Sequence, residues 1–120
     1  MFRAIDHVQL AIPEGGEAQA RSFWCDLLGF AELPKPDSLA KRGGAWFQLG
    51  AIQVHVGVES PFTPAKKAHP AFVVSDLAVL VDSLAAAGHP ARWDYEIPNV
   101  ARCHIDDPFG NRIELIEQTS

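Results

Sequence analysis

His7-Val-Gln-Leu-Ala-Ile12 and His69-Pro-Ala-Phe-Val-Val74 are two stretches of this chain that look like copies of one unit. In each copy a second residue able to bind metal follows at nearly the same spacing. His7 and His55 are 48 residues apart, and His69 and Glu114 are 45 apart. Three imidazoles and one carboxylate are a suitable donor set for a divalent metal ion. The sequence therefore predicts a duplicated fold that carries a duplicated half-site.

Alternating polarity and helical spacing predict the same order of elements in both halves. The expected elements of the first half are a strand at 3–12, a helix at 17–28, and strands at 31–34, 46–49 and 52–58. After a linker at 59–68 that contains two prolines, the second half is expected to hold a strand at 71–74, a helix at 77–87, and strands at 91–93, 102–105 and 112–117. Each half thus has the order βαβββ.

The repeated order predicts an α+β fold, a single domain built of two βαβββ modules at residues 1–60 and 66–120. Each module has a sheet covered on one face by its helix, and it gains stability by pairing with a second copy. We expect the two modules to form a cupped mixed sheet around a central cavity. A pseudo-two-fold axis between the modules would then bring the four candidate ligands together.

Four further side chains are candidates for substrate binding, namely Trp46, Gln48, His104 and Arg112. Trp46 and Gln48 share one face of a predicted strand, but the sequence does not decide whether that face meets the cavity or the core. Arg112 shares the face of Glu114, either near the cavity rim or as a solvated charge at the strand end. His104 is expected to contact substrate or to support the metal ligands.

Composition excludes some classes of partner. The formal net charge is −5 and there is no basic stripe, which argues against nucleic acid. Lys41-Arg42 and Lys66-Lys67 are expected to be solvated loop charges. No apolar run approaches the roughly 20 residues of a membrane span, and the N-terminus lacks a signal sequence, so a cytoplasmic protein is expected. Cys25 and Cys103 form no spacing motif and are expected to be reduced, apolar fillers.

At these positions the chain resembles the vicinal oxygen chelate superfamily. This superfamily includes glyoxalase, extradiol ring-cleaving dioxygenases, fosfomycin-resistance enzymes and bleomycin-binding proteins. The resemblance covers nearly the whole chain, and its most specific part is the ending Asp107-Pro-Phe-Gly-Asn-Arg-Ile-Glu-Leu115. The other matching motifs are His7-Val-Gln-Leu-Ala-Ile12, Phe23-Trp-Cys-Asp-Leu-Leu-Gly-Phe30 and His69-Pro-Ala-Phe-Val-Val-Ser-Asp-Leu77.

The resemblance implies paired βαβββ modules, a homodimer and a divalent metal ion held by His7, His55, His69 and Glu114. The ion (Fe, Mn, Ni, Co or Zn) would chelate two neighbouring oxygens of a small-molecule substrate, with Glu114 as the first candidate for proton transfer. Four ligands are typical of glyoxalase-like lyases and isomerases, whereas ring-cleaving dioxygenases use three. Typical glyoxalases carry a glutamate where His55 stands. The alternative is a metal-free protein of the bleomycin-resistance type that sequesters a small molecule.

Overall fold

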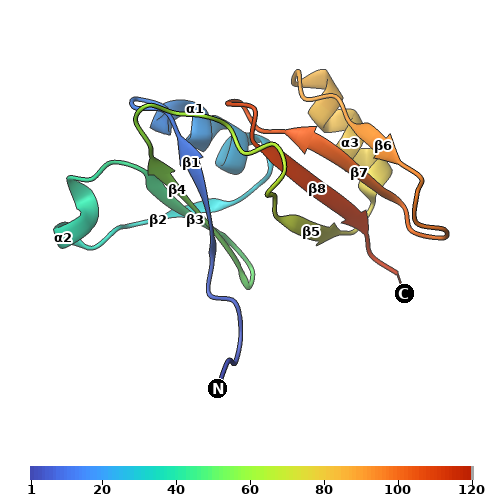
Figure 1. Cartoon of the computed structure of the whole chain (residues 1–120), viewed down its shortest axis with the longest axis horizontal. Helices are drawn as coiled ribbons and strands as arrows, with labels where there is room; N and C mark the ends of the chain where they lie inside the picture. Colours follow the sequence, from blue (N-terminus) through green and yellow to red (C-terminus); the bar gives the residue numbers. More distant parts are fainter. Residues whose placement is uncertain (120) are drawn as a thin grey trace. The chain divides into compact units, whose positions relative to one another are not determined.

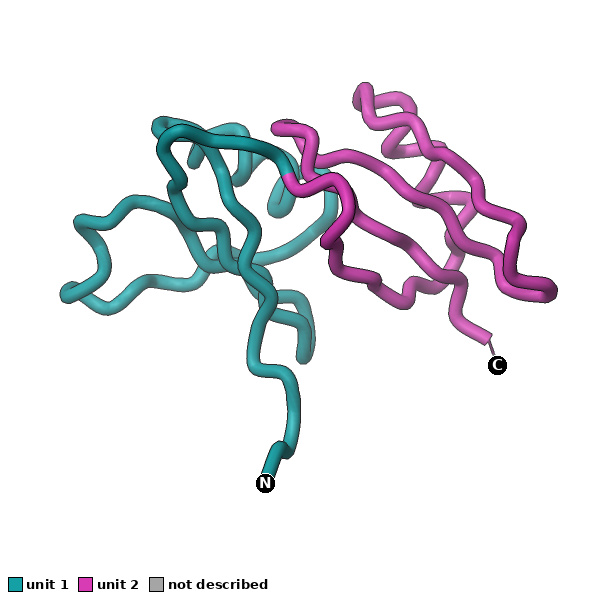
Figure 2. The backbone as a smooth tube through the Cα atoms, viewed as in Figure 1, with its two compact units in different colours: residues 1–64 teal, residues 65–120 magenta. Residues whose placement is uncertain are grey.

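The computed structural model describes residues 1–119, and the chain divides into two compact units, residues 1–64 and 65–120 (Figure 2). Each unit contains one four-stranded mixed sheet with helices packed on it (Figure 1). The α+β class and the two βαβββ modules predicted from the sequence are confirmed. No helix among the described residues is both long and apolar enough to cross a membrane.

Unit 1 pairs its first strand with its last. Its sheet has the order β1-β4-β3-β2, in which β1 runs parallel to β4 and the other neighbours are antiparallel. A tight turn at Gly50-Ala51 joins β3 to β4 as a hairpin. The elements are β1 (Val8–Ile12), α1 (Glu17–Arg21), η1 (Ser22–Leu27), β2 (Ala31–Leu33), α2 (Asp37–Ala40), β3 (Ala45–Leu49) and β4 (Ile52–Val58).

Unit 2 repeats this topology in the order β5-β8-β7-β6, again with the first and last strands parallel. The antiparallel pairs β6–β7 and β7–β8 complete its sheet. Its elements are β5 (Ala71–Val74), α3 (Leu77–Ala86), β6 (Arg92–Asp94), β7 (Arg102–Asp106) and β8 (Arg112–Glu117). The shared topology means that equivalent strand positions in the two units can be compared residue by residue.

In each unit, the core lies between the sheet and its helices. Strand side chains alternate, so one set faces the helices and the other set faces away. The buried apolar side chains of unit 1 are Leu10, Ile12, Ala20, Phe23, Trp24, Phe30, Ala45, Phe47, Val54 and Val56. Those of unit 2 are Leu77, Leu84, Cys103, Ile105, Ile113 and Leu115. Polar residues that alternate with this set, among them His55 and Glu114, therefore lie on the opposite sheet faces.

The predicted elements differ from the observed ones at three places. The first strand begins at Val8, where pairing with β4 begins, and not at residue 3. The predicted helix at 17–28 widens after Arg21 into a π-helix, marked by the Leu28 N–H donating to the Phe23 carbonyl at 3.1 Å. The wider turn lets the adjacent side chains of Phe23 and Trp24 both enter the core, each 2% exposed. The short helix α2 has no counterpart in the prediction.

A serine and an aspartate, Ser75 and Asp76, precede α3 and predict a side-chain N-cap, which the structure does not show. Asp76 stands at the N-cap, but it has φ 51° and its side chain makes no capping hydrogen bond. The carboxylate of Glu117 on β8 accepts the Leu77 N–H at 2.7 Å. A carboxylate at the N-terminus of a helix is favoured by the helix dipole. It also accepts from a backbone N–H that has no partner within the helix. The helix is thus capped by the sheet on which it packs.

The Asp107–Asn111 turn fixes where β8 begins. Both side chains are buried, and Asn111 Nδ2 donates to Asp107 Oδ2 at 2.9 Å. Asp107 Oδ1 also accepts the backbone N–H groups of Phe109 and Asn111. Asn111 Oδ1 accepts the N–H of Ala65 at 2.9 Å, which ties the start of unit 2 to the turn. Burial raises the pKa of Asp107, and these hydrogen bonds oppose that rise.

Candidate functional site

The strand registers give the two units matching half-sites. In unit 1, His7 lies two residues before Gln9, and Gln9 pairs with His55. In unit 2, His69 lies two residues before Ala71, and Ala71 pairs with Glu114. The antiparallel neighbours also correspond, because Trp46 pairs with His55 and His104 pairs with Glu114. The duplicated spacing in the sequence is therefore a duplicated arrangement of strands.

Three rings form a stack on the exposed sheet face of unit 1. The ring centroids of His7 and His55 are 3.9 Å apart, and those of Trp46 and His55 are 4.4 Å apart. His55 lies in the middle and is only 5% exposed. Burial lowers the pKa of His55, and the nearby His7 lowers it further. The imidazole of His55 is therefore held in its neutral form, the form that binds metals.

Hydrogen bonds indicate which ring nitrogen carries the hydrogen on each histidine of the stack. His7 Nδ1 lies 2.9 Å from the Asp6 carboxylate, so Nδ1 carries the hydrogen and Nε2 keeps its lone pair. His55 Nε2 donates to Gln53 Oε1 at 3.1 Å, which leaves the lone pair on Nδ1. The two ring planes differ by 13°, so the in-plane lone pairs of the two rings lie in nearly parallel planes. Both rings can face one ion only after one of them rotates.

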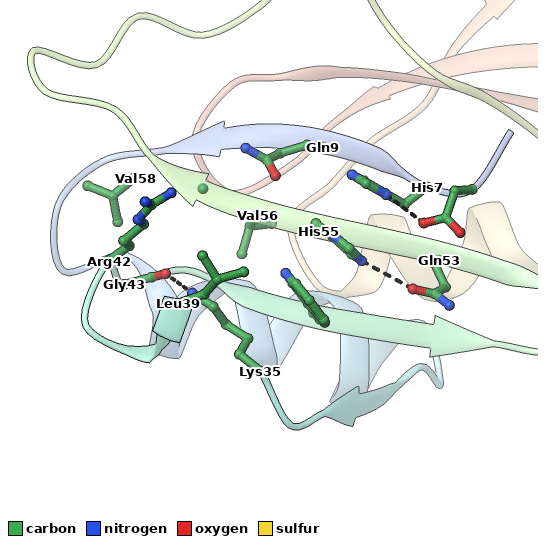
Figure 3. A pocket seen from close by; sticks show the side chains of 13 residues that line it. His7, Gln9, Lys35, Leu39, Arg42, Gly43, Gln53, His55, Val56 and Val58 are labelled. Carbon is green, nitrogen blue, oxygen red and sulfur yellow. Dashed lines mark hydrogen bonds and ion pairs between the residues drawn. The ribbon is translucent and has the colours of Figure 1, made fainter. Parts of the chain in front are cut away.

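The stack forms one side of a cavity of about 500 Å³ in unit 1 (Figure 3). Trp46 lines it, which places that side chain on the cavity face and not in the core. Gln9 also lines it, and Gly57 makes room for the Gln9 side chain, because a Cβ at Gly57 would lie 2.6 Å from Gln9 Nε2. Gln48 is not among the lining residues, and its amide donates to the Gly50 carbonyl.

In unit 2, His69, His104 and Glu114 bring one possible ligand atom each within 4.8 Å of one another. His69 Nε2 lies 2.9 Å from Glu114 Oε1, and His104 Nε2 lies 3.7 Å from the same oxygen. Backbone bonds hold the strands that carry them in register, including the Glu114 N–H donating to the Pro70 carbonyl at 3.0 Å. The arrangement can bind a cation through two imidazoles and one carboxylate.

The second oxygen of Glu114 is engaged by Arg102. Arg102 Nη1 donates to Glu114 Oε2 at 3.1 Å, and Nη2 lies 2.8 Å from Asp94 Oδ2. Burial alone would raise the pKa of Glu114. The effect of burial is outweighed by the hydrogen bonds to His69 and Arg102 and by the positive charge of Arg102. The pKa of Glu114 therefore lies below its usual value. Glu114 is therefore ionised, with only Oε1 directed at the histidines.

The pairing register of β7 on β8 adds His104 to the two ligands predicted for unit 2, His69 and Glu114. Burial lowers its pKa, and although the Glu114 charge acts in the opposite direction, Arg112, His69 and Arg102 lower it further. His104 is thus a neutral donor beside a charged carboxylate. Arg112 influences His104 electrostatically, and its backbone N–H donates to the Ala65 carbonyl at 2.9 Å.

Of the residues singled out from the sequence, His7, His55 and Trp46 meet in unit 1, and His69, His104 and Glu114 meet in unit 2. Sequence analysis missed Arg102, which lies two residues before His104 on the same face of β7. It also treated Arg42 as a solvated loop charge, although Arg42 lines the cavity of unit 1 together with Lys35. Arg102 could have been recognised from the sequence. Side chains alternate along a strand, so Arg102 points to the same face of β7 as His104.

The group in unit 2 fits a divalent metal ion by its donor chemistry. His69 Nδ1 lies 2.8 Å from the Lys67 carbonyl oxygen, which can only accept, so Nδ1 carries a hydrogen. His69 Nε2 also lies 2.9 Å from the ionised Oε1 of Glu114, and this contact is satisfied by a cation between the two atoms, either a proton or a metal ion. Donor atoms around a divalent ion lie roughly 3–4 Å apart. The separations of 2.9 and 3.7 Å are close to that range.

The fold and these polar clusters define a class of protein. The family model of the Glyoxalase/Bleomycin resistance protein/Dioxygenase superfamily matches residues 4–115, and the chain belongs to this superfamily. The family resemblance recognised from the sequence motifs is thereby confirmed. No protein with curated annotation is similar enough in sequence to count as a match.

Among solved structures, a protein from Bacillus anthracis assigned to the glyoxalase family is 45% identical, with a TM-score of 0.93, over 99% of this chain and 98% of that one. A glyoxalase family protein from Enterococcus faecalis is 22% identical, with a TM-score of 0.75, over 97% and 98% of the two chains. The fosfomycin resistance protein FosX from Listeria monocytogenes is 14% identical, with a TM-score of 0.74, over 99% and 96%. The last two similarities establish the fold alone.

Proposed function

We propose that this protein is a divalent-metal-dependent enzyme of the glyoxalase or dioxygenase type, acting on a small molecule with two neighbouring oxygen atoms. The observation that carries the proposal is the His69–His104–Glu114 group, with its three donor atoms within 4.8 Å. Membership of the superfamily supports a metal-dependent reaction. The candidate ligands predicted from the sequence are His7 and His55 in unit 1 and His69 and Glu114 in unit 2, and the second pair gains His104 as a further donor.

A bound ion would act as a Lewis acid on the two substrate oxygens and so stabilise negative charge as it forms. The chain's own residues have separate tasks. Arg102 holds Oε2 of Glu114, which leaves Oε1, the oxygen that faces His69 and His104, to bind an ion or to accept a proton. The Lys67 carbonyl fixes the tautomer of His69. Glu114 is the proposed acid–base residue, because it is ionised and lies beside the donors.

The residue at position 55 bears on which reaction is catalysed. Typical glyoxalases have a glutamate there that takes part in proton transfer, whereas this chain has a buried imidazole of lowered pKa. A neutral imidazole can also accept a proton, but His55 lies in the middle of the ring stack in unit 1. The proposal places proton transfer on Glu114, which is ionised and lies beside His69 and His104, and it gives His55 a ligand or wall role.

The second candidate is a metal-free protein that binds and sequesters a small molecule. The cavity of about 500 Å³ in unit 1 favours it, because binding in this cavity needs no ion. Under this alternative, the ring stack of His7, His55 and Trp46 is a flat wall for the bound molecule.

Metal analysis of protein purified without a histidine tag separates the two candidates. We expect about one divalent ion per chain, lost in His69→Ala and weakened in Glu114→Gln. The matched control is His89→Asn, which removes a histidine of unit 2 outside the group. Equal metal affinity in the three variants would contradict the proposed site. Absence of metal binding by the natural sequence would favour the sequestering protein. The metal itself is informative, since iron or manganese favours oxygen chemistry and nickel, cobalt or zinc favours isomerisation.

The proposed assembly is a homodimer. Within each four-stranded sheet, the outer strands β1 and β2, or β5 and β6, pair on one side only. Unpaired strand edges are commonly covered by another element or subunit. Light scattering at micromolar concentration should give twice the chain mass of 13.1 kDa. A monomer under those conditions would contradict this part of the proposal.

A further inference from the structure

The cavity of unit 1 has a charge opposite to that of the whole chain. The formal net charge of the protein is −5. The cavity, however, is lined by two permanent cations, Lys35 and Arg42, and by one carboxylate, Asp6. Asp6 is hydrogen-bonded to His7, at the histidine side of the cavity. Within residues 1–119, neither Lys35 nor Arg42 makes an ion pair with a carboxylate. The cavity lining therefore carries more cationic than anionic side chains.

The loop that carries the two cations holds the side chain of Lys35 and the backbone of Arg42. Lys35 is half-buried, and its ammonium group donates a hydrogen bond to the Gly43 carbonyl. The Arg42 N–H donates to the Leu39 carbonyl at 3.1 Å at the end of α2. Figure 3 shows Lys35, Leu39 and Arg42 along one side of the cavity, with His7 and His55 farther along it. The Lys35 side chain is thus anchored, whereas the exposed Arg42 side chain is positioned only through its backbone.

Two glycines fasten this loop to the sheet. Gly43 and Gly44 have φ values of 74° and 81°, which favour glycine. A Cβ at Gly44 would meet the Val56 carbonyl oxygen at 2.2 Å, so only glycine allows the loop to approach β4 this closely. The Gly44 N–H also donates to Glu17 Oε2 at 2.9 Å. Glu17 is thereby engaged by the backbone, and the Lys35 charge contributes to lowering the pKa of Glu17 without a direct ion pair between the two side chains among residues 1–119.

The remaining walls differ from the cationic side. Gln9 and Gln53 present amide groups, and the stacked rings of His55 and Trp46 present a flat surface. A molecule that fits this lining has an acidic group at one end and a planar or oxygen-bearing part at the other. Charge-assisted hydrogen bonds to Lys and Arg are roughly twice as strong as neutral ones, so the acidic end supplies specificity.

We propose that the cavity of unit 1 binds a small organic anion, with its carboxylate or phosphonate against Lys35 and Arg42 and its other end towards His55 and Trp46. This inference rests on the proposed function, and it narrows the substrate from any molecule with neighbouring oxygens to an acidic one. The cations select the substrate, and they are separate from the proposed metal donors.

The test compares two probes that differ only in charge. 3,4-Dihydroxybenzoate carries neighbouring oxygens and a carboxylate, and 3,4-dihydroxybenzamide is its uncharged counterpart. In calorimetric titrations we expect the acid to bind at least about tenfold more tightly. Arg42→Gln and Lys35→Gln should each remove most of that preference, and Arg42→Lys should retain part of it. Lys41→Gln is the control, because it removes a neighbouring charge that does not line the cavity.

The outcomes separate this inference from the proposed function. Titrations in metal-depleted and metal-loaded protein measure the two properties independently. If metal does not bind but the acid is preferred and Arg42→Gln abolishes the preference, the anion site stands and the metal enzyme does not. If metal binds but acid and amide bind equally, or neither binds, the anion site is overturned. An equal effect of Lys41→Gln and Arg42→Gln would also overturn it, by showing a general charge effect. Circular dichroism of each variant checks that the fold is kept.

Discussion

Arg102→Gln tests the organisation of the polar group in unit 2. The natural side chain joins two carboxylates, Glu114 at 3.1 Å and Asp94 at 2.8 Å, and only 13% of it is exposed. Substitution leaves Glu114, itself 11% exposed in its side chain, without its cationic partner. We expect the variant to fold with reduced stability and to show weaker metal binding, because the freed carboxylate can rotate and the pKa of Glu114 rises.

The magnitude follows from the contacts. Two charge-assisted hydrogen bonds contribute roughly 3–6 kcal/mol together. Arg102 Nε, however, is buried with no hydrogen-bond partner, and removing such a donor returns about 1–3 kcal/mol. Asp94 is 21% exposed in its side chain and regains some water. The net loss in unfolding free energy should be about 2–3 kcal/mol, between a surface pair and a fully buried one.

Urea denaturation measures this loss, with Arg92→Gln as the matched control. Arg92 lies on the neighbouring strand β6 and also binds a carboxylate in two places, but that pair is exposed. Its loss should cost less than about 1 kcal/mol. A double-mutant cycle with Glu114→Gln should give a coupling energy of at least about 1 kcal/mol. Equal costs for the two arginine variants, or no coupling, would refute the reasoning.

Three further predictions concern single residues. Burial lowers the pKa of His55, so below about pH 6.5 the unfolded chain binds more protons than the native state. The contribution of His55 to the free energy of unfolding should therefore be fully present above that pH and should decrease as the pH falls towards the native pKa. Melting experiments at several pH values should show a smaller decrease in His55→Gln. Gly57→Ala should leave stability nearly unchanged but displace the flexible Gln9 amide from the cavity, seen as an altered Gln9 side-chain NMR signal; an unmoved signal would contradict the packing. Asn111→Ala should cost about 2–4 kcal/mol in urea denaturation, because Asp107 loses a partner while buried, and a loss below about 1 kcal/mol would contradict that role.

Much of the fold could be predicted because alternation and turns determine strand faces locally. Ile52–Val58 and Arg112–Glu117 were predicted with their observed bounds, since runs that contain β-branched residues and begin after a glycine or asparagine turn are typical of strands. The π-helical turn could not be predicted in this way. The apolar spacing around Phe23 and Trp24 is compatible with either helix, and the choice depends on packing against residues distant in the sequence.

Candidate site residues could be predicted where the spacing between them repeats in the sequence. They were harder to predict where their position depends on how two strands pair. His7, His55, His69 and Glu114 came from the duplicated spacing, and each pair meets within its own unit. The position of His104 required the register of β7 on β8. Pairing Asp106 with Arg112 across the turn at Asp107–Asn111 places His104 opposite Glu114, but turn length alone leaves several registers open. The roles of Arg42 and Lys35 depend on loop geometry, for which composition gives no signal.

The pairing of first and last strands in each unit has a kinetic consequence. In unit 1, β1 cannot pair with β4 until nearly all of the intervening chain is in place, and the same holds for β5 and β8 in unit 2. Such non-local pairing slows folding, because the entropy of closing the loop is lost before the contacts form. The hairpins β3–β4 and β7–β8 are local and are expected to form earlier. His55 and Glu114 would then be positioned early, while His7 and His69 would join them only as the chain completes its slowest step.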